Sequence, residues 1–358
     1  MTTVSDTDMV SDTDMVNPTD ARSVWRGLGG AGVLDRLYPD GADPDRRVLE
    51  TLLATLDAHH PPGVVLSVCV QAASALPLLR AVAGGSDTAD QARRGEAVVA
   101  LAATDAAVAG SALLDGRTRV DADGDEVVLH GGKDWITNAG SCDAVLVLAR
   151  HRPARHFTSF CWVLVPAGHP GVHVEPAPTR YFAGAAVGHL RFDGVRLPAA
   201  HVVGRPGRAL AEFARQVAVE RLAGALWARA LCRRVLADTH RFLRDRSAGA
   251  TTLWDNAAIR ERFARCLVEW SRLDAMCAAQ PRSVPDATAG MVLKAAYAAS
   301  ADRILGECAD LRGADAFRTG GLADLRAEAA MFGIAGGATG ALLAQLADRA
   351  ADVLGDGA

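Results

Sequence analysis

Hydrophobic residues change their spacing twice along this chain, and the changes divide it into three regions. Between residues 19 and 101, leucines recur at helical spacing, as in 49–56, which predicts helices with one apolar face. Residues 102–205 hold short alternating runs between Gly, Pro and Asp turns, a pattern typical of strands. Long segments rich in Ala, Leu and Arg follow from 206 to 358 and predict helices again. We therefore expect an α+β protein that is mainly α, with a central β region.

A repeated hexapeptide precedes these regions. The sequence VSDTDM occurs at 4–9 and again at 10–15. It is acidic and poor in aliphatic side chains, so it has little apolar surface to bury. We expect residues 1–18 to form a disordered tail.

Composition excludes several classes of function. The 358 residues carry a formal net charge of -4, so the chain lacks the basic field that nucleic acids attract, and we expect no nucleic-acid partner. The longest apolar runs, such as 63–70, are far shorter than a bilayer span, and the N-terminus shows no basic and then apolar leader. These features predict a cytoplasmic protein with no membrane association.

Cysteine and glycine patterns narrow the chemistry further. The seven cysteines are scattered, with no Cys-x-x-Cys pair, so we expect free thiols and no metal site. The chain has no Gly-x-Gly-x-x-Gly and no Walker-type loop. Binding of a dinucleotide by a Rossmann unit and nucleotide hydrolysis are therefore not expected.

The segment 131–139, read as GGKDWITNA, carries the candidate chemistry of the β region. Its place between a glycine-rich turn and an apolar run predicts a strand, with Trp135 and Thr137 on one face at period two. An aromatic ring beside a hydroxyl can stack on a flat heterocycle and hydrogen-bond its edge. A tryptophan that fills a core is the alternative for an isolated strand.

Four motifs in this region together resemble the middle of the acyl-CoA dehydrogenase family, and they occur in the family's order. They are Thr104-Asp105, Gly110-Ser111, the strand 133–138 read as KDWITN, and 191–198 read as RFDGVRLP. The resemblance implies an N-terminal helical domain at 19–101, a central small β-barrel domain at 102–205 and a C-terminal four-helix bundle at 206–358.

The resemblance also implies FAD as the cofactor, bound between the β domain and the C-terminal helices. Trp135 would then flank the isoalloxazine ring, with Ile136 beside it in the same motif. Thr137 would hydrogen-bond near the reactive flavin nitrogen. The pyrimidine side would be contacted by the segment that contains Thr104, Gly110 and Ser111.

One carboxylate in the C-terminal half is a candidate base on physical grounds. In the helix expected at about 208–237, apolar residues repeat at steps of three and four, and Glu220 lies on the stripe that they form. Desolvation there would raise its pKa and suit it to accept a proton near neutral pH. The alternative is a structural glutamate paired with Arg215 or Arg221.

The resemblance gives Glu220 a role in catalysis. Most members of the family carry their base near the C-terminus, where this chain has Gly336. The isovaleryl and long-chain branch, which some carrier-protein-bound aminoacyl oxidases resemble, instead uses a Glu-Arg pair in the first long C-terminal helix, and Glu220-Arg221 matches that pair. The resemblance implies that Glu220 is the base, that Arg221 orients its carboxylate, and that the Gly336 N–H donates to the thioester carbonyl.

The segments that hold the FAD pyrophosphate in the family are altered here. Members bind it across a subunit interface, with an Arg-x-x-Phe-Gly turn and a Gln-x-x-Gly-Gly segment. The first becomes 246–250, which keeps Arg246 and lacks the Phe, and the second places Asp310 where the family has Gln. An aspartate near a pyrophosphate repels it unless it is turned away or paired with Arg312. The family also implies a homodimer or homotetramer.

Three hypotheses for function remain from the sequence. The first is an FAD-dependent dehydrogenase that performs α,β-oxidation of an acyl or aminoacyl thioester on CoA or on a carrier protein, with an electron-transfer flavoprotein or oxygen as electron acceptor. The second is a flavin-dependent monooxygenase on the same fold, which needs no glutamate base. The third is a catalytically silent relative that acts as a subunit or binding module.

Overall fold

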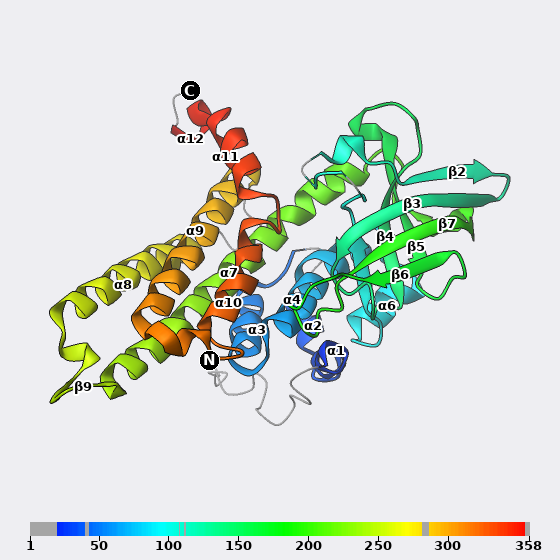
Figure 1. Ribbon diagram of the computed structural model, residues 1–358. Helices are drawn as coiled ribbons and strands as arrows, with labels where there is room; N and C mark the ends of the chain where they lie inside the picture. The colour runs from blue at the N-terminus through cyan, green and yellow to red at the C-terminus, as the bar shows by residue number, and fades with distance from the viewer. Residues whose placement is uncertain (1–19, 40–42, 107, 111, 281–285, 355–358) are drawn as a thin grey trace, which may run out of the picture.

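The computed structural model describes residues 20–39, 43–106, 108–110, 112–280 and 286–354, so the expected tail at 1–18 lies outside the described residues. Along the described residues, helices precede and follow a twisted sheet, and in Figure 1 the sheet lies on the right with α8 and α9 on the left. The expected α+β class, mainly α, is therefore confirmed, and so is the helix, sheet, helix order.

The N-terminal helices begin where the sequence supplies caps. Asp45 accepts hydrogen bonds from the backbone N–H groups of Arg47 and Val48 at the start of α3, and Pro62 occupies the first turn of α4. The helices of this part are α1 (Ala21–Gly30), α2 (Val33–Leu37), α3 (Arg46–His59), α4 (Pro62–Val70), α5 (Leu76–Ala83) and α6 (Asp87–Arg93). A π-helical segment, Gln71–Ala75, joins α4 to α5 without a break.

The continuous helix Pro62–Ala83 corrects one expectation. It is long and apolar enough to cross a membrane by length and composition, because the π segment carries the helix through Gln71 and Ser74. However, 83% of its most apolar window is buried inside the protein, which is typical of a core helix.

The central region forms one eight-stranded sheet in the order β6-β7-β3-β2-β4-β5-β8, with β1 paired to β4. The link between β2 and β4 is a single residue pair, Arg119 with Arg150, so the sheet consists of two halves around a common core. The strands are β1 (Val99–Ala102), β2 (Arg119–Asp123), β3 (Glu126–Ile136), β4 (Ala144–Arg150), β5 (Phe160–Pro166), β6 (Val172–Pro176), β7 (Gly188–Pro198) and β8 (Val202–Val203).

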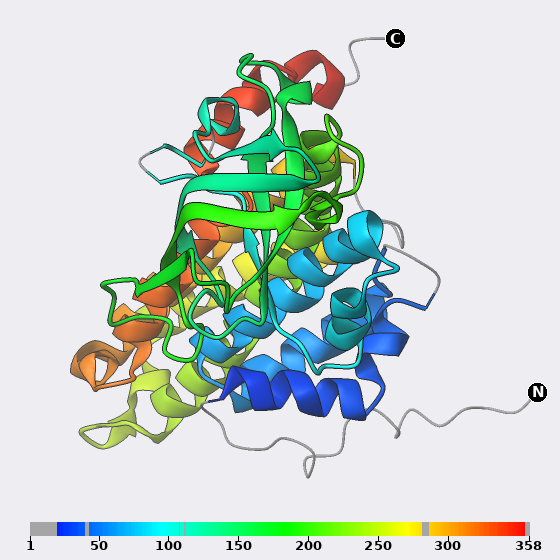
Figure 2. The same ribbon diagram turned by 90° about the vertical axis from the view of Figure 1, so that its right-hand side faces the viewer.

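The strand β4 explains how the sheet joins the helices. Its residues are apolar on both faces. Leu146 and Leu148 pack into the core that the helices share, whereas Val145 and Val147 pack into a second core inside the sheet. A strand buried on both sides reads as a continuous apolar run. In Figure 2 the N-terminal helices, in blue, lie side by side with the sheet.

Three long helices dominate the C-terminal part, and α7 contacts both of the others. They are α7 (Ala209–Asp245), α8 (Ala257–Ala278) and α9 (Ala287–Arg312). The shorter elements are the hairpin of β9 (Ser247–Ala248) and β10 (Thr251–Thr252), then α10 (Leu322–Ala329), α11 (Thr339–Ala347) and α12 (Ala350–Leu354). In its middle α7 is buried nearly all round, between α3 and α9, so its apolar surface is wider than the single stripe expected from the sequence.

All seven cysteines are free thiols. Six are buried, and Cys142 is partly buried. Burial raises the pKa of the Cys69 thiol to about 12 and that of the Cys142 thiol to about 11.

Candidate active site

The end of β3 holds Trp135 in an unusual backbone conformation. Its φ is 58°, in the left-handed region that a bulky residue rarely adopts, and the register with β7 shifts between Lys133 and Ile136. The Trp135 side chain is 57% exposed. The expected alternation is wrong here, because the bulge interrupts the strand and β3 ends at Ile136, which leaves Thr137 in the following turn. The exposed ring also excludes the alternative of a core tryptophan.

The turn after Trp135 is fixed to α4. Asn138 also has a positive φ, 67°, and is fully buried. Its side-chain oxygen accepts from Ser67 Oγ at 2.5 Å, and its Nδ2 donates to the Ser67 carbonyl at 3.3 Å. The backbone N–H of Asn138 donates to the Ala185 carbonyl at 2.9 Å. These bonds hold the Trp135 end of the sheet against the N-terminal helices.

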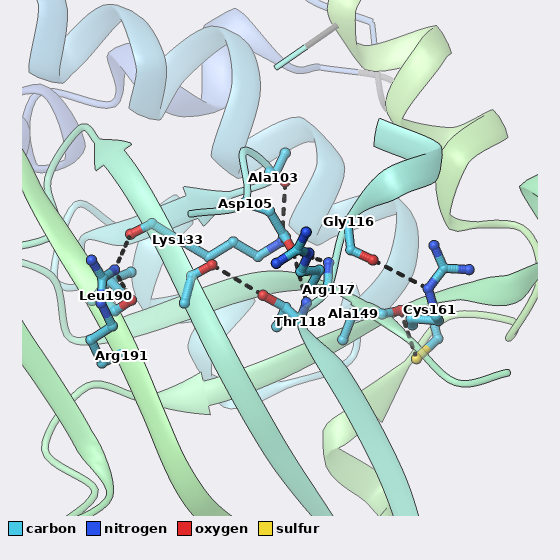
Figure 3. Close-up of polar contacts among 12 residues, drawn as sticks. Ala103, Asp105, Gly116, Arg117, Thr118, Lys133, Ala149, Cys161, Leu190 and Arg191 are labelled. Atoms are coloured by element: carbon cyan, nitrogen blue, oxygen red, sulfur yellow. Dashed lines mark hydrogen bonds and ion pairs between the residues drawn. The ribbon is translucent and has the colours of Figure 1, made fainter. Parts of the chain in front are cut away.

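A buried ion pair connects the first and third motifs. Lys133 is 1% exposed and Asp105 is 5% exposed, and the two side chains are in direct contact (Figure 3). Lys133 Nζ also donates to the Ala103 carbonyl at 3.1 Å, and the second oxygen of Asp105 accepts from the backbone N–H of Thr118 at 2.7 Å. Desolvation lowers the pKa of Lys133 to about 8, against the attraction of Asp105.

This pair brings the threonine segment to the tryptophan strand. The Thr104 carbonyl accepts from the backbone N–H of Asp134 at 3.2 Å. A Cβ placed on Gly110 would lie 3.5 Å from Thr104 Oγ1, so these two candidate residues are neighbours. Ser111, the third member expected in this segment, lies outside the described residues.

A histidine that the sequence analysis missed lies beside Trp135. The rings of His189 and Trp135 meet edge to face, with centroids 5.5 Å apart. His189 Nδ1 lies 3.0 Å from Asp134 Oδ1, which also accepts from Arg191 Nη1 at 2.8 Å. His189 is on β7 and Asp134 on β3. Only the pairing of these two strands could have shown that the residues meet.

Glu220 lies in the buried middle of α7 and remains partly exposed. Burial raises the pKa of its carboxyl, against a hydrogen bond from Ser74, the charge of Arg221, the backbone of Gly336 and the charge of Lys294. Ser74 Oγ donates to Glu220 Oε2 at 3.3 Å. Arg215, one candidate for a structural partner, instead pairs with Asp43 at 3.2 Å.

Arg221, the other candidate partner, contacts the Gly336 turn. Its Nε donates to the Gly336 carbonyl at 2.9 Å. Consecutive residues on a helix point in different directions, so Arg221 acts on Glu220 through its charge, which favours the ionised carboxylate. Its expected role in orienting that carboxylate stays a prediction. Gly336 has a φ of 70°, and a Cβ built on it would lie 3.7 Å from Glu220 Oε1. The structure thus brings Glu220, Arg221 and Gly336 together.

A buried lysine on α9 completes this cluster and was also missed. Lys294 is fully buried, and its Nζ donates to Thr339 Oγ1 at 2.9 Å, which in turn donates to the Gly333 carbonyl at 3.0 Å. Burial lowers the pKa of Lys294 to about 8. The signal available in the sequence was a single lysine inside the apolar run 291–297.

Arg246 lies away from this cluster. It follows the last residue of α7, 26 positions after Glu220, which at 1.5 Å per residue is about 39 Å along the helix. It lines an open pocket together with Asp238, Arg241, Phe242, Asp245 and Arg312. Asp310 pairs with Arg262 at 3.7 Å, and Arg312 pairs with Asp315 at 3.4 Å. Asp310 is therefore turned away from this pocket, although it does not pair with Arg312.

Two models of known protein families match the sheet region and the C-terminal helices of this chain. The model of the acyl-CoA dehydrogenase middle domain matches residues 100–195, and that of the acyl-CoA dehydrogenase C-terminal domain matches residues 210–351. The chain belongs to the acyl-CoA dehydrogenase family. Members of this family depend on FAD.

Curated relatives within the acyl-CoA dehydrogenase family match parts of the chain. The probable acyl-CoA dehydrogenase FadE25 of Mycobacterium bovis is 34% identical over 100 residues, which are 28% of this chain and 26% of that protein. The chain thus spans about a quarter of the length of the FadE25 proteins that it matches. Acyl-[acyl-carrier-protein] dehydrogenase MbtN of Mycobacterium sp. is 26% identical over 300 residues, covering 82% of this chain and 76% of that one.

Solved structures of acyl-CoA dehydrogenases share the fold. Glutaryl-CoA dehydrogenase from Mycobacterium smegmatis superimposes with a TM-score of 0.81 at 20% identity, over 92% of this chain and 86% of that chain. Butyryl-CoA dehydrogenase from Megasphaera elsdenii gives 0.82 at 17% identity, over 91% and 89%. A second structure of the glutaryl-CoA enzyme contains FADH2. At these identities the likeness shows the fold alone.

The residues of this chain fit a flavin in two places. The exposed Trp135 ring, at the end of a strand fixed by buried bonds, offers a flat apolar surface to a planar heterocycle. The pocket at the C-terminal end of α7 combines Arg241, Arg246 and Arg312 with the Phe242 ring and with two carboxylates, Asp238 and Asp245. The three arginines outnumber the carboxylates, and with the ring they suit a diphosphate and an aromatic base.

Proposed function

We propose that this protein is an FAD-dependent dehydrogenase of an acyl or aminoacyl thioester carried by CoA or by a carrier protein. The observation that carries the proposal is the position of Glu220, a partly exposed carboxylate with a raised pKa whose Oε1 faces Gly336. A base with its pKa nearer to neutrality is suited to remove the weakly acidic α-proton of a thioester.

The cluster around Gly336 supplies the rest of the proton chemistry. Glu220 takes the α-proton, and the backbone N–H of Gly336 donates a hydrogen bond to the thioester carbonyl, where negative charge develops. Arg221 holds the carbonyl of the same residue and so fixes the orientation of the turn. Its positive charge favours the ionised form of Glu220 through space. Arg221 is thus assigned to the turn rather than to a direct pair with the base.

FAD, when bound, supplies the acceptor for the hydride that leaves the β-carbon. The residues that would hold its ring are Trp135, Ile136 and Thr137 at the end of β3, with Thr104, Gly110 and Ser111 on the pyrimidine side. Trp135 would stack on the ring and exclude water from one face. The Asp105–Lys133 pair would hold the threonine segment in place.

The position of Arg246 leads us to include a second copy of the chain in the proposal, because Arg246 would bind a flavin held by that copy. It lies about 39 Å from Glu220 along α7, too far to contact a flavin that lies on Trp135 of its own chain near Glu220. Arg246 would then bind the diphosphate of a flavin held by the partner, in a homodimer or homotetramer. We further propose a cytoplasmic location and an electron-transfer flavoprotein or oxygen as the electron acceptor.

The relatives reported above bear dehydrogenase names, which gives no support to a flavin monooxygenase. A silent relative remains the alternative against which the proposal is tested. In that case Glu220 would be an ordinary buried carboxylate, and its replacement would leave substrate-driven chemistry unaffected.

The test replaces Glu220 with Gln and follows anaerobic bleaching of the flavin by acyl thioesters. Because the amide cannot accept the proton, E220Q should retain flavin and reduce it about 10²- to 10⁴-fold more slowly. E212Q is the matched control, since Glu212 lies two turns earlier on α7 and its pKa is also raised by burial. Bleaching of E220Q at the wild-type rate would remove Glu220 from the mechanism, and no bleaching of the wild type by any thioester would support the silent relative.

A further inference from the structure

The continuous helix Pro62–Ala83 changes from α-helical to π-helical geometry next to Glu220, the candidate base. Between α4 and α5, residues Gln71–Ala75 form a π-helical turn, in which the backbone N–H of Leu76 donates to the carbonyl of Gln71, five residues earlier. Such wide turns are rare in helices, and those that do occur are often at functional sites. All five residues of this turn are buried.

The π turn contacts α7 at two points. Gln216 Nε2 donates to the Ala73 carbonyl, and Ser74 Oγ donates to Glu220 Oε2. Gln216 and Glu220 are four residues apart on α7, so they lie one above the other on the same face of that helix. Ser74 is 1% exposed and Gln216 is 6% exposed, which keeps water from replacing either bond.

The two oxygens of Glu220 therefore have different surroundings. Oε2 is held by Ser74 at 3.3 Å, and Oε1 lies 3.7 Å from the Cβ position of residue 336. A glutamate side chain that is held at one oxygen by a buried hydroxyl presents the other in a fixed direction. The backbone of Gly336 also favours the ionised carboxylate, but without the Ser74 bond the Oε2 side of the carboxylate is no longer held and the group can turn.

We propose that Ser74, presented by the π turn, is a positioning residue for the base: it holds Glu220 Oε2 so that Oε1 faces the substrate α-carbon at Gly336. This inference rests on the proposed function, because it assigns Ser74 a role through Glu220. Gln216 supports Ser74 by fixing the carbonyl of the preceding residue, Ala73.

The hydrogen bond from Ser74 also favours the ionised form of the carboxylate. The other groups near Glu220 are the backbone of Gly336, Arg221 on α7, Cys69 on α4, and Lys294 and Tyr297 on α9. Arg221 and Lys294 lower the pKa of Glu220, whereas burial raises it above the ordinary value. Loss of the Ser74 hydroxyl leaves these groups in place, so the pKa of Glu220 rises further and its active, ionised form is lost at a higher pH.

The experiment measures kcat and KM of the FAD-loaded enzyme over a pH series that includes the acidic limb of the wild-type profile. The probe is whichever of butyryl-, isovaleryl- and octanoyl-CoA the wild type oxidises fastest. In S74A the acidic limb of kcat/KM should move to higher pH by about one unit, so that activity on that limb falls by up to about tenfold. KM should change little, because Ser74 does not touch the substrate.

S300A is the matched control. Ser300 is also buried and its Oγ donates to a glutamate, Glu269 Oε1, at 2.8 Å, but this pair joins α9 to α8 away from the Gly336 turn. It should leave the pH profile unchanged. S74C, with nearly the same volume and a weaker donor, carries the same test if S74A does not fold, and its acidic limb should move in the same direction.

Parallel measurement of E220Q separates the two ideas. If E220Q retains full activity, the proposed function itself fails. If E220Q is inactive while the acidic limbs of S74A and S74C coincide with those of the wild type and S300A, Glu220 is the base and the role of Ser74 is overturned.

Discussion

For the buried ion pair of Asp105 and Lys133, we can predict both the direction and the approximate size of the change in the free energy of unfolding when Asp105 is replaced. Replacing Asp105 with Asn removes the charge that Lys133 contacts, while an amide oxygen can still accept from the Thr118 backbone. The amide nitrogen would then be a second donor facing Lys133 Nζ. Removal of one partner from a buried ion pair costs about 3–5 kcal/mol, and the low exposure of both side chains, 1% and 5%, places D105N in that range.

The pKa of Lys133 sets the pH range of the effect. Its ordinary value is 10.5 and its value in the folded protein is about 8, so protonated Lys133 already costs the folded state about 3 kcal/mol at neutral pH. Between about pH 8 and 10.5 the unfolded chain binds more protons, and the free energy of unfolding of the wild type rises with pH. In D105N the pKa of Lys133 falls further, so this rise begins at a lower pH. The deficit of D105N should therefore be largest at low pH, shrink as the pH rises toward 8, and be smallest above about pH 8.

The assay is urea unfolding of wild type and variant at several pH values, with and without FAD. D121N is the matched control, because Asp121 pairs with Arg119 on the surface at 58% and 56% exposure, where ion pairs contribute less than about 1 kcal/mol. D105N should also lose affinity for FAD, since Asp105 joins the Thr104 segment to β3. Equal stabilities of D105N and D121N at pH 7 would refute the reasoning.

Two further predictions concern the flavin and thioester sides of the site. W135A should lose little stability, because the ring is 57% exposed, but FAD should raise its melting temperature much less than that of the wild type. F157A, which removes another ring that is 55% exposed, is the control and should show the wild-type shift with FAD. Equal shifts in all three proteins would place Trp135 away from the cofactor. G336E places a second carboxylate toward Glu220 and should lower activity at neutral pH with an altered pH profile. G320E, at the same φ of 70° but in open space, measures backbone strain alone, and a G336E profile identical to that of G320E would contradict the expected repulsion.

The sequence predicted those features that depend on spacing along the chain. Helical and alternating patterns located the three regions, and Glu220 was found because a carboxylate interrupts apolar positions on one helix. The bulge at Trp135 was missed, because period two cannot reveal an irregular pairing with β7 that places the ring outward on a backbone of positive φ. The sequence motif thus drew attention to Trp135 but predicted the wrong local geometry for it.

Contacts between residues on different helices and strands could not be predicted from the sequence. Ser74 lies in the π turn just before α5, and Lys294 lies on α9. Both join the Glu220 cluster, but no spacing along the chain relates them to position 220. The contact of Arg221 with the Gly336 turn was also beyond the sequence. Arg221 follows Glu220 in the chain, but neighbouring helical positions diverge, and its guanidinium donates to the Gly336 carbonyl.

The burial of the cysteines gives this protein a set of built-in reporters of local opening. Cys69, Cys161, Cys232, Cys266 and Cys308 lie on α4, β5, α7, α8 and α9 in turn, so each structural layer carries its own thiol. An alkylating reagent can reach these thiols only while the surrounding segment is open. The rates at which individual cysteine peptides gain the mass of the reagent would therefore rank the opening of the sheet and helices in the wild-type sequence, with no residue substituted.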